Sequence, residues 1–432
     1  MTQSAPSTRR KVALVTSGFK SGGGGVSAIA RWLCDCLRAT GSYTVDIHDL
    51  ATSSRDVSSR RLGAPTSWAR PSLRAYSGGE NAVTHWGANL VEFEMMRYWP
   101  RKELTQALRS YDLIQVVAGG PALAWAVNGT GVPTVLYVAT LVAWERQRQL
   151  AEAPIPERLW RQGTTILAAH IERLALASVD AVLVLNDSLL EYVRSGGHRR
   201  VAKALPGVDT TIFSPPLGGW RRKGYLLSVC RLAEPRKGID RMVRAYAHMV
   251  EADESIPRLV LVGRGELPDA LLNRIRLLGL EPRVTIRANV SAGDLPDLYR
   301  GASLFLQTSY EEGLGMSVVE AMACGLPVVS TYSAGSRETV VDGVTGRLVP
   351  QDGGVDVAHS VASMVLEILR RDGGAMGARA RERCLSRFST EVAIRRFTDT
   401  YDDLLMEHPH GTSVTSHSEG GGGDRPEILP GR

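Results

Sequence analysis

The sequence lacks several features that would indicate other classes of protein. No apolar run approaches the roughly 18 residues that a membrane-spanning helix needs. The five cysteines are scattered and odd in number, and the nine histidines form no cluster with the spacing of metal ligands. These absences predict no transmembrane helix, no disulfide framework and no metal site, and they indicate free thiols in a reducing compartment.

Two short motifs are also missing. No Asp-x-Asp pair is available to hold a metal-bound diphosphate. No G-x-G-x-x-G fingerprint follows a strand pattern, as a nicotinamide-dependent oxidoreductase would require. A two-domain oxidoreductase therefore stays only as an alternative, because it would share the pattern of strands and helices given below.

Length and charge set further bounds. At 432 residues the chain is long enough for two domains with their own cores. The net charge of +6 can favour phosphorylated ligands or an anionic membrane, but no nucleic-acid motif accompanies it. The N-terminal apolar run is too short for a secretory signal. We expect a cytoplasmic protein without a nucleic-acid partner, and we leave open peripheral contact with the inner, anionic face of the membrane.

Strand patterns alternate with helical patterns through both halves of the chain. Buried strands are expected at 11–16, 43–47, 112–117, 133–138, 180–185 and 201–205, and then at 225–230, 258–262, 284–287, 303–308 and 327–331. Such alternation predicts an α/β fold with parallel sheets covered by helices on both faces. We expect two Rossmann-like, doubly wound domains that face each other across a cleft, with ligands at the carboxyl ends of the strands.

Changes in composition give the expected domain boundaries. The segments are a disordered N-terminus at 1–10, a first domain at 11–206, a Gly-, Pro- and Arg-rich linker at 207–223, a second domain at 224–386, an amphipathic helix at 387–406 and a disordered tail at 407–432. Within the first domain, 51–79 has little periodicity and is expected to be a long loop.

The stretch from Ser309 to Pro350 contains the most informative motif. Glu312 and Glu320 are separated by seven residues, and Gly313, Leu314 and Gly315 follow the first of them. The pattern predicts Glu312 in a loop at the mouth of a helix and Glu320 about two turns inside that helix. Glycines there let a ligand approach backbone N–H groups, and each carboxylate offers two acceptor oxygens to adjacent hydroxyls.

Two cations follow a predicted strand in the segment SVCRLAEPRKGID. The guanidinium of Arg231 and the ammonium of Lys237 could neutralise a diphosphate. Taken alone, the segment could equally be a solvated basic loop. Its position ahead of the Glu312 and Glu320 motif favours the binding interpretation.

Two glycine-containing turns complete the candidate site. The run SGGGGV, with Gly23 and Gly24 at its centre, follows the first predicted strand and opens a helix. The segment VGRGEL places Gly263 in a turn after another strand. Each is a weak signal by itself, since such glycines also occur in ordinary loops.

Together these segments resemble the retaining glycosyltransferases of family 4, which have the GT-B fold. The resemblance implies that Glu312 contacts the donor sugar and that Glu320 contacts the nucleotide ribose. It assigns Arg231 and Lys237 to the diphosphate, with Arg231, Lys237 and Glu312 as the catalytic residues. The residues implied around the nucleotide sugar are Gly23, Gly24, Gly263, Gly313, Leu314, Gly315 and Glu320.

The implied reaction moves a hexosyl group, with retention, from a nucleotide-diphosphate sugar to a hydroxyl of a glycan, lipid or small metabolite. UDP is favoured over GDP as the nucleotide, and no metal or other cofactor is expected. Many family members have a His after the fourth strand of the first domain, where this chain has Ala139 and Thr140. His85 or Asp187 could contribute a polar group instead. A catalytically weak or inactive nucleotide-sugar-binding protein is therefore the second alternative.

Overall fold

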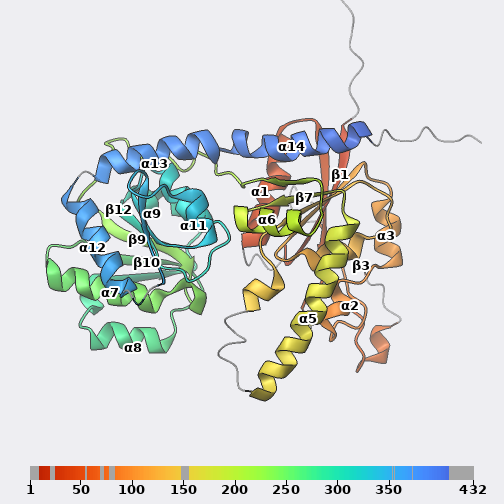
Figure 1. Ribbon diagram of the computed structural model, residues 1–432, viewed down its shortest axis with the longest axis horizontal. Helices are drawn as coiled ribbons and strands as arrows, with labels where there is room; N and C mark the ends of the chain where they lie inside the picture. The colour runs from red at the N-terminus through yellow and green to blue at the C-terminus, as the bar shows by residue number, and fades with distance from the viewer. Residues whose placement is uncertain are drawn as a thin grey trace, which may run out of the picture.

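The structure is a computed structural model that describes residues 9–19, 25–53, 56–68, 73–76, 83–146, 155–352, 354, 356–371 and 373–407. It consists of two α/β lobes, each built around one sheet (Figure 1). None of the helices that it describes is long and apolar enough to cross a membrane.

The first lobe has an eight-stranded sheet in the order β3-β4-β2-β1-β5-β6-β7-β8. Its strands are β1 (Arg10–Ser17), β2 (Tyr43–Leu50), β3 (Leu73–Tyr76), β4 (Val83–Trp86), β5 (Leu113–Ala118), β6 (Thr134–Val138), β7 (Ala181–Val184) and β8 (Val201–Lys203). Its helices are α1 (Gly25–Ala39), α2 (Glu94–Arg97), α3 (Lys102–Leu108), α5 (Ile155–Ser178) and α6 (Asp187–Ser195), with short 3-10 turns η1 (Pro65–Ser67) and η2 (Pro121–Val127).

The second lobe has a six-stranded parallel sheet in the order β11-β10-β9-β12-β13-β14. Its strands are β9 (Tyr225–Arg231), β10 (Leu259–Arg264), β11 (Val284–Ala288), β12 (Ala302–Gln307), β13 (Val328–Thr331) and β14 (Gly346–Val349). Its helices and 3-10 turns are η3 (Pro235–Lys237), α7 (Ile239–Ala252), α8 (Asp269–Leu277), η4 (Glu281–Arg283), α9 (Leu295–Arg300), α10 (Met316–Ala323), α11 (Ala334–Thr339), α12 (Val357–Arg370) and α13 (Gly373–Arg387).

Every strand expected from the sequence is present, with ends shifted by a few residues. The expectation of a continuous long loop at 51–79 is wrong, because Leu73–Tyr76 forms β3, an antiparallel edge strand on β4. Both strands are only four residues long and have little alternation of their own. β3 and β4 pair at the edge of a sheet whose other strands come from distant segments of the chain. Their own short sequences therefore contain no pattern that predicts them.

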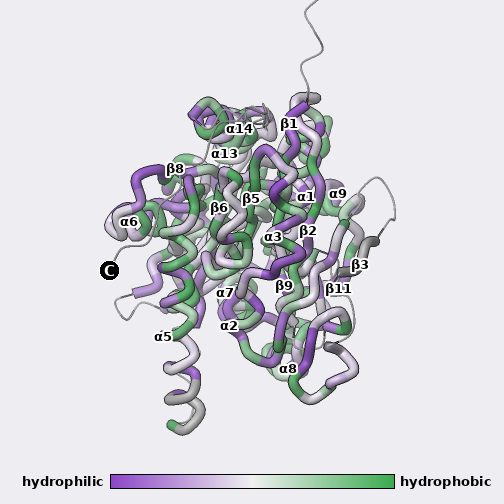
Figure 2. Tube along the Cα trace, turned by 90° about the vertical axis from the view of Figure 1, so that its right-hand side faces the viewer, coloured by the Kyte–Doolittle hydropathy of each residue, from purple (hydrophilic) through white to green (hydrophobic). Residues whose placement is uncertain are grey.

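Central strands of both sheets are buried on both faces. All six residues of β5 and of β12 are buried, as expected for parallel sheets that helices cover on each side. In Figure 2 hydrophobic residues run along the central strands, and α5 projects below the rest of its lobe. Packing on both faces fixes the positions at which the strands end, and the candidate site is built on those ends.

The last helix, α14 (Thr390–Glu407), runs from the second lobe back across the first (Figure 1). Its Phe397 ring packs edge-on against Trp32 of α1, with ring centroids 5.8 Å apart. Its Tyr401 hydroxyl donates to Gln115 Oε1 of β5 at 2.7 Å, in the interior of the first lobe. The helix is therefore part of the first lobe's core, although it comes last in the sequence.

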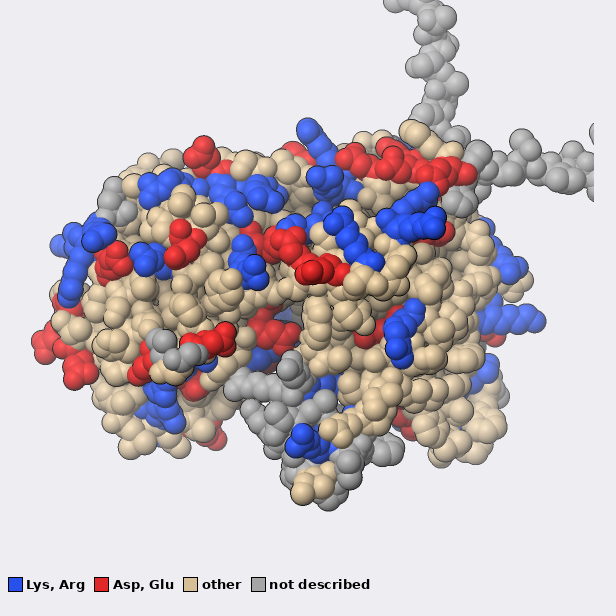
Figure 3. Space-filling view, viewed as in Figure 1, with Lys and Arg blue, Asp and Glu red and all other residues tan. Residues whose placement is uncertain are grey.

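The two lobes face each other and contact directly. Asn186, which caps α6, donates from Nδ2 to the carbonyl oxygen of Gly313 at 3.3 Å. Lys203, at the end of β8, pairs with Glu338 of α11 at 2.7 Å. A recess lies between the lobes in the space-filling view, with acidic and basic side chains at its margin (Figure 3). This is where the carboxyl ends of both sheets meet.

Candidate functional site

The loop between β12 and α10 contains the first acidic residue of the motif. Gly315 has a φ of 84°, and this left-handed conformation ends the loop and starts α10 at Met316. Glu312 thus lies ahead of the helix, where the sequence places it. The expected position of Glu320 two turns into the helix is wrong. It is just over one turn in, because α10 begins only after Gly315.

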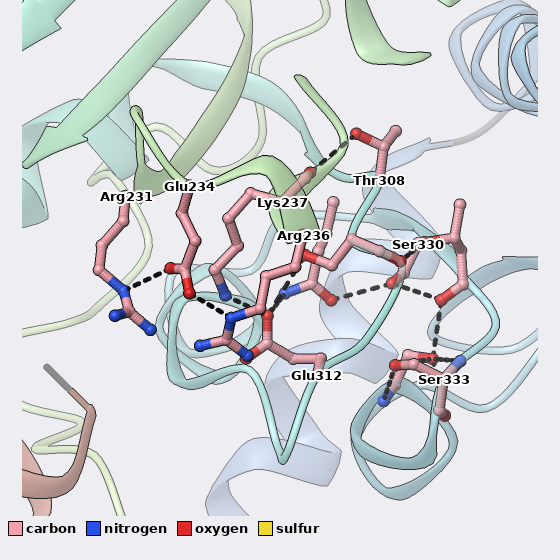
Figure 4. Close-up of polar contacts among 12 residues, drawn as sticks. Arg231, Glu234, Arg236, Lys237, Thr308, Glu312, Ser330 and Ser333 are labelled. Atoms are coloured by element: carbon pink, nitrogen blue, oxygen red, sulfur yellow. Dashed lines mark hydrogen bonds and ion pairs between the residues drawn. The ribbon is translucent and has the colours of Figure 1, made fainter. Parts of the chain in front are cut away.

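Glu312 and Lys237 form the central ion pair of the site (Figure 4). Lys237 Nζ lies 2.6 Å from Glu312 Oε2, and the two side chains are only 10% and 13% exposed. Gln307 Nε2 and Ser309 Oγ donate to the same oxygen at 3.4 and 3.3 Å. Within the described residues all three donors reach Oε2, so Oε1 is the oxygen that remains available to a further donor.

A left-handed glycine brings Lys237 to this position. Gly238 has a φ of 63° and follows the 3-10 turn η3. A Cβ there would lie 2.1 Å from the carbonyl oxygen of Thr308, so only glycine permits this approach of η3 to the end of β12. Thr308 Oγ1 in turn donates to Gly238 O at 2.8 Å. Because β9 and β12 are neighbours in the sheet, Lys237 and Glu312 meet at their carboxyl ends.

Arg231 ends β9 beside the same pair, but its partner is a residue that the sequence analysis missed. Its Nε lies 2.7 Å from Glu234 Oε2, and Arg236 also pairs with Glu234 (Figure 4). Arg231 ends a strand and Glu234 precedes the turn η3, so no helical spacing marks them as a pair in the sequence. Glu234 therefore orients two guanidinium groups next to Lys237.

Glu320 occupies a separate position. Tyr299 of α9 donates its hydroxyl to Glu320 Oε2 at 2.6 Å. Burial raises the pKa of Glu320 to about 7, against the opposing effect of that hydrogen bond. No hydrogen bond or ion pair among the described residues joins Glu320 to Lys237 or Glu312. The structure thus brings Arg231, Lys237 and Glu312 together, while Glu320 lies within α10 and is bound to Tyr299.

The predicted glycines differ in what the structure says about them. Gly263 lies within β10, paired with Cys230 of β9, so the expectation that it lies in a turn after the strand is wrong. A Cβ on Gly263 would lie 1.5 Å from the Cys230 carbonyl oxygen. Its own carbonyl accepts from Asn289 N at 2.6 Å, and the pairing of β10 with β9 places it beside the strand that ends in Arg231. Gly23 and Gly24 lie outside the described residues, and their predicted role stays a prediction.

Helix α11 supports the motif loop from behind, which the sequence analysis did not anticipate. Gly335 N donates to Glu312 O at 2.9 Å, and a Cβ on Gly335 would lie 2.6 Å from Leu314 N. Ser333 and Ser336 form a capping box that starts this helix. The SAGS sequence was a readable helix-start signal, and it fixes the backbone of the loop that carries Glu312.

On the first lobe, the segment after β6 stands opposite this loop. The carbonyl oxygen of Ala139 lies 3.7 Å from the position of a Cβ on Gly313. Both suggested substitutes for the family's His have ionic partners of their own. Asp187 pairs with Lys203 at 2.7 Å, and His85 is bound on β4 between two carboxylates.

His85 is a structural ion-pair centre. Its Nδ1 lies 2.8 Å from Asp49 Oδ2, and its Nε2 lies 2.8 Å from Asp56 Oδ2. Burial alone would lower its pKa, but the two carboxylates outweigh burial and raise the pKa of His85 to about 9. The imidazolium therefore links β4, the end of β2 and the segment after it.

Cations rather than metal ligands characterise the site. Over the described ranges, no group of three or more His, Cys, Asp or Glu side chains is placed to hold a metal ion. The groups gathered at the strand ends are a lysine and two arginines, which donate, and two carboxylates, which accept. Such a set suits a ligand that has both anionic oxygens and hydroxyl groups.

Two Rossmann-like lobes with this arrangement at their facing strand ends define a GT-B glycosyltransferase. The family model described as Glycosyl transferases group 1 matches residues 218–373. The D-inositol 3-phosphate glycosyltransferase of Salinispora tropica is 30% identical over 334 residues, which are 71% of this chain and 67% of that protein. The Rhodococcus opacus protein of the same name is 30% identical over 303 residues, 67% of this chain and 66% of its own length.

Solved structures agree on the fold. The sucrose-phosphate synthase of Thermosynechococcus elongatus superposes with a TM-score of 0.66 at 22% identity, over 92% of this chain and all of that one. Anabaena HepE in complex with UDP and glucose gives 0.65 at 18% identity, over 91% of this chain and all of that one. The chain belongs to the glycosyl transferases group 1 family and is a glycosyltransferase. The predicted family and fold are confirmed, and the oxidoreductase alternative has no support.

Proposed function

We propose that this glycosyltransferase moves a hexosyl group, with retention and without a metal, from a UDP-sugar to a hydroxyl acceptor. The observation that carries the proposal is the Lys237–Glu312 pair at 2.6 Å, at the meeting point of β9 and β12. It combines a cation for the leaving diphosphate with a carboxylate for the sugar at one place. UDP is chosen because relatives of the same fold bind it, HepE among them.

Charge on the leaving diphosphate explains the role of the cations. As the bond to the sugar breaks, negative charge accumulates on the phosphate oxygens, and fixed positive groups there lower the barrier. The Lys237 ammonium has three N–H donors, and one of them reaches Glu312. The other two, with the Arg231 guanidinium, can serve phosphate oxygens. Cations at this position replace the metal that other transferases use.

Glu312 acts on the sugar as a positioning group. Its Oε2 already accepts from Lys237, Gln307 and Ser309, so Oε1 is the oxygen offered to a sugar hydroxyl. We therefore assign Glu312 to holding the sugar rather than to the covalent attack by which the second carboxylate of a retaining glycoside hydrolase acts. Glu320, on α10, is suited to the two adjacent ribose hydroxyls.

For the acceptor we propose a hydroxyl compound that also carries a phosphate. The reason is that the similar proteins of Salinispora tropica and Rhodococcus opacus are both named D-inositol 3-phosphate glycosyltransferase. The group that we propose to bind this phosphate is Arg101, between α2 and α3, which is 3% exposed and has Asp56 as its charged neighbour. Its Nη2 donates to Arg97 O at 2.8 Å, while Nε and Nη1 have no partner among the described residues. A buried guanidinium with unpaired N–H groups is costly, and an anion would satisfy them.

The proposal is tested by assaying a panel of UDP- and GDP-sugars with polyol acceptors, each with and without a phosphate group. Proton NMR of the product's anomeric centre, with a chelator present, is expected to show retention. An inverted anomer, or activity that chelator abolishes and Mg²⁺ restores, would contradict the mechanism. Donor binding without transfer or hydrolysis would favour the alternative of an inactive nucleotide-sugar-binding protein.

Arg101→Gln tests the acceptor class. It should raise the acceptor KM about tenfold or more for a phosphorylated acceptor, because one charged contact is lost, and leave the donor KM unchanged. Arg109→Gln, an exposed arginine at the end of α3, is the matched control. Equal use of phosphorylated and unphosphorylated acceptors would contradict this part of the proposal.

A further inference from the structure

A buried glutamate that the proposed chemistry does not use lies behind the first lobe's side of the site. Glu172 of α5 is 4% exposed, and its Oε1 accepts a hydrogen bond from Val142 N at 3.0 Å. In the part of the chain that the structure describes, this is the only hydrogen bond to the carboxyl. The same oxygen lies 2.6 Å from the position of a Cβ on Gly120. The carboxyl therefore touches the backbone after β5 and the backbone after β6.

These two segments are joined to each other and face the donor side. Thr140 N donates to Gly119 O at 2.8 Å, and Ala139 N donates to the same oxygen at 3.2 Å. The Ala139 carbonyl oxygen lies 3.7 Å from the Cβ position of Gly313, the residue after Glu312. A short series of contacts thus connects Glu172 to the motif loop of the other lobe.

We propose that Glu172 is a positioning residue for glycosyl transfer: its carboxylate holds the Gly119–Gly120 turn and the 139–142 segment in register opposite Glu312. The inference rests on the proposed function. Ala139 has no polar side chain to offer a ligand. Backbone groups and the Thr140 hydroxyl are what this segment can offer to a ligand, so their placement depends on the group that anchors the segment from behind.

The charges around Glu172 make its ionisation relevant near neutral pH. Burial raises the pKa of Glu172 to about 7, against the Val142 N–H group and Arg146. Glu145 and Glu94 act in the same direction as burial, and Glu94 also pairs with Arg146 at 2.6 Å. Tyr98, which packs nearby, is neutral in this range because burial raises its pKa to about 12. The ionised carboxylate accepts from Val142 N more strongly than the protonated form does, so the anchor weakens as pH falls.

Glu172→Gln separates this role from simple packing, since it keeps the shape and one acceptor oxygen but cannot ionise. In the wild type, kcat should fall below about pH 7. The variant should lose that inflection and have a kcat about tenfold lower at pH 8, with the donor KM unchanged. Glu191→Gln, an exposed glutamate on α6, is the matched control. An active Glu172→Gln enzyme that keeps the wild-type pH profile would overturn the proposal.

Gly120→Ala disturbs the same contact with Glu172 by changing its backbone partner instead of the carboxyl group. Its methyl group would meet Glu172 Oε1 at 2.6 Å and displace the carboxyl. It should lower kcat as Glu172→Gln does, and the double variant should lose less than the product of the two effects. Multiplicative losses would contradict a shared role.

An NMR titration distinguishes failure of the inference from failure of the proposed function. The Val142 amide resonance should shift with a midpoint near pH 7 in the wild type and not in Glu172→Gln. A resonance that shifts as expected beside a flat rate profile would overturn the positioning role alone. A wild type that transfers no sugar in any condition would overturn the proposed function, and the inference with it.

Discussion

The two sides of the cleft are built in different ways. On the second lobe, the groups at the strand ends are side chains from two short segments, 231–238 and 307–320, which adjacent strands bring into direct contact. On the first lobe, the facing surface consists of backbone after β5 and β6, with buried charged groups behind it. The family model matches 218–373, which covers the first kind of site and none of the second. Under the proposed function, the donor side is built from two short segments on adjacent strands, whereas the acceptor side depends on how segments more distant in the sequence pack.

The largest effect on activity is expected from removing a cation at the proposed donor site of the second lobe. Lys237→Ala removes the cation nearest to Glu312, and kcat/KM should fall about a hundredfold, because charge on the leaving group loses a fixed partner. Slow hydrolysis of the donor without acceptor should fall by the same factor, since it has the same leaving group. Steady-state kinetics of both reactions measure this.

Lys223→Ala is the control for Lys237→Ala, because Lys223 is an exposed lysine just before β9. Thermal unfolding of both variants is needed as well, since loss of a buried cation leaves Glu312 uncompensated. Unchanged kinetics in a folded Lys237→Ala enzyme would contradict the assignment of Lys237 to the diphosphate.

An intermediate effect on nucleotide binding is expected from Glu320. Ribose hydroxyls donate to an ionised carboxylate, so binding favours the ionised form, and burial raises the pKa of Glu320 to about 7. The Kd for UDP should therefore fall as pH rises from about 6 to about 8. Glu320→Gln should raise the Kd about tenfold and remove this pH dependence.

Isothermal titration calorimetry in buffers of different ionisation enthalpy detects the proton that wild-type Glu320 releases on binding. Glu382→Gln, an exposed glutamate on α13, is the control. Proton release that persists in Glu320→Gln would assign it to another group. The nucleotide site would then include a titratable group outside the Glu312 and Glu320 motif.

The smallest effect on activity is expected from substitution of His85, whose ion pairs lie within the first lobe. The pKa of His85 is raised from 6.5 to about 9 in the folded protein, since its carboxylate partners outweigh burial. Its contribution to the free energy of unfolding is therefore complete below about pH 6.5 and is lost as pH rises through about 9. His85→Gln should lower that free energy by up to about 3 kcal/mol at pH 6 and much less at pH 10, with the Kd for UDP unchanged.

Chemical denaturation at several pH values measures the His85 contribution. His359→Gln, an exposed histidine on α12, should show no such trend. A pH-independent loss in His85→Gln would mean that His85 contributes by packing rather than by charge. A change in UDP affinity would show that the first lobe's ion pairs also act on the donor side.

The contrast between the two lobes also applies to which features of the fold and the site could be predicted from the sequence. Strand patterns and the spacing of Glu312 and Glu320 are local properties, so the fold and the donor motif could be inferred. The position of Glu320 was misjudged by about one turn, because the left-handed Gly315 decides where α10 starts. Nothing in the local sequence marks Glu172 as a neighbour of Gly120, since their contact requires α5 to be packed on the strand ends.

The close crossing of the chain beside Gly207 constrains how the lobes can move. The chain passes between the lobes twice, and the two passages are bonded to each other, from Val208 N to Phe388 O at 2.8 Å and from Thr390 N to Val208 O at 3.2 Å. A Cβ on Gly207 would lie 2.8 Å from the Ala393 side chain, so the passages lie as close as backbones allow. A single connection would permit twisting as well as bending. Two parallel connections resist twisting, so any rotation between the lobes is favoured about one axis.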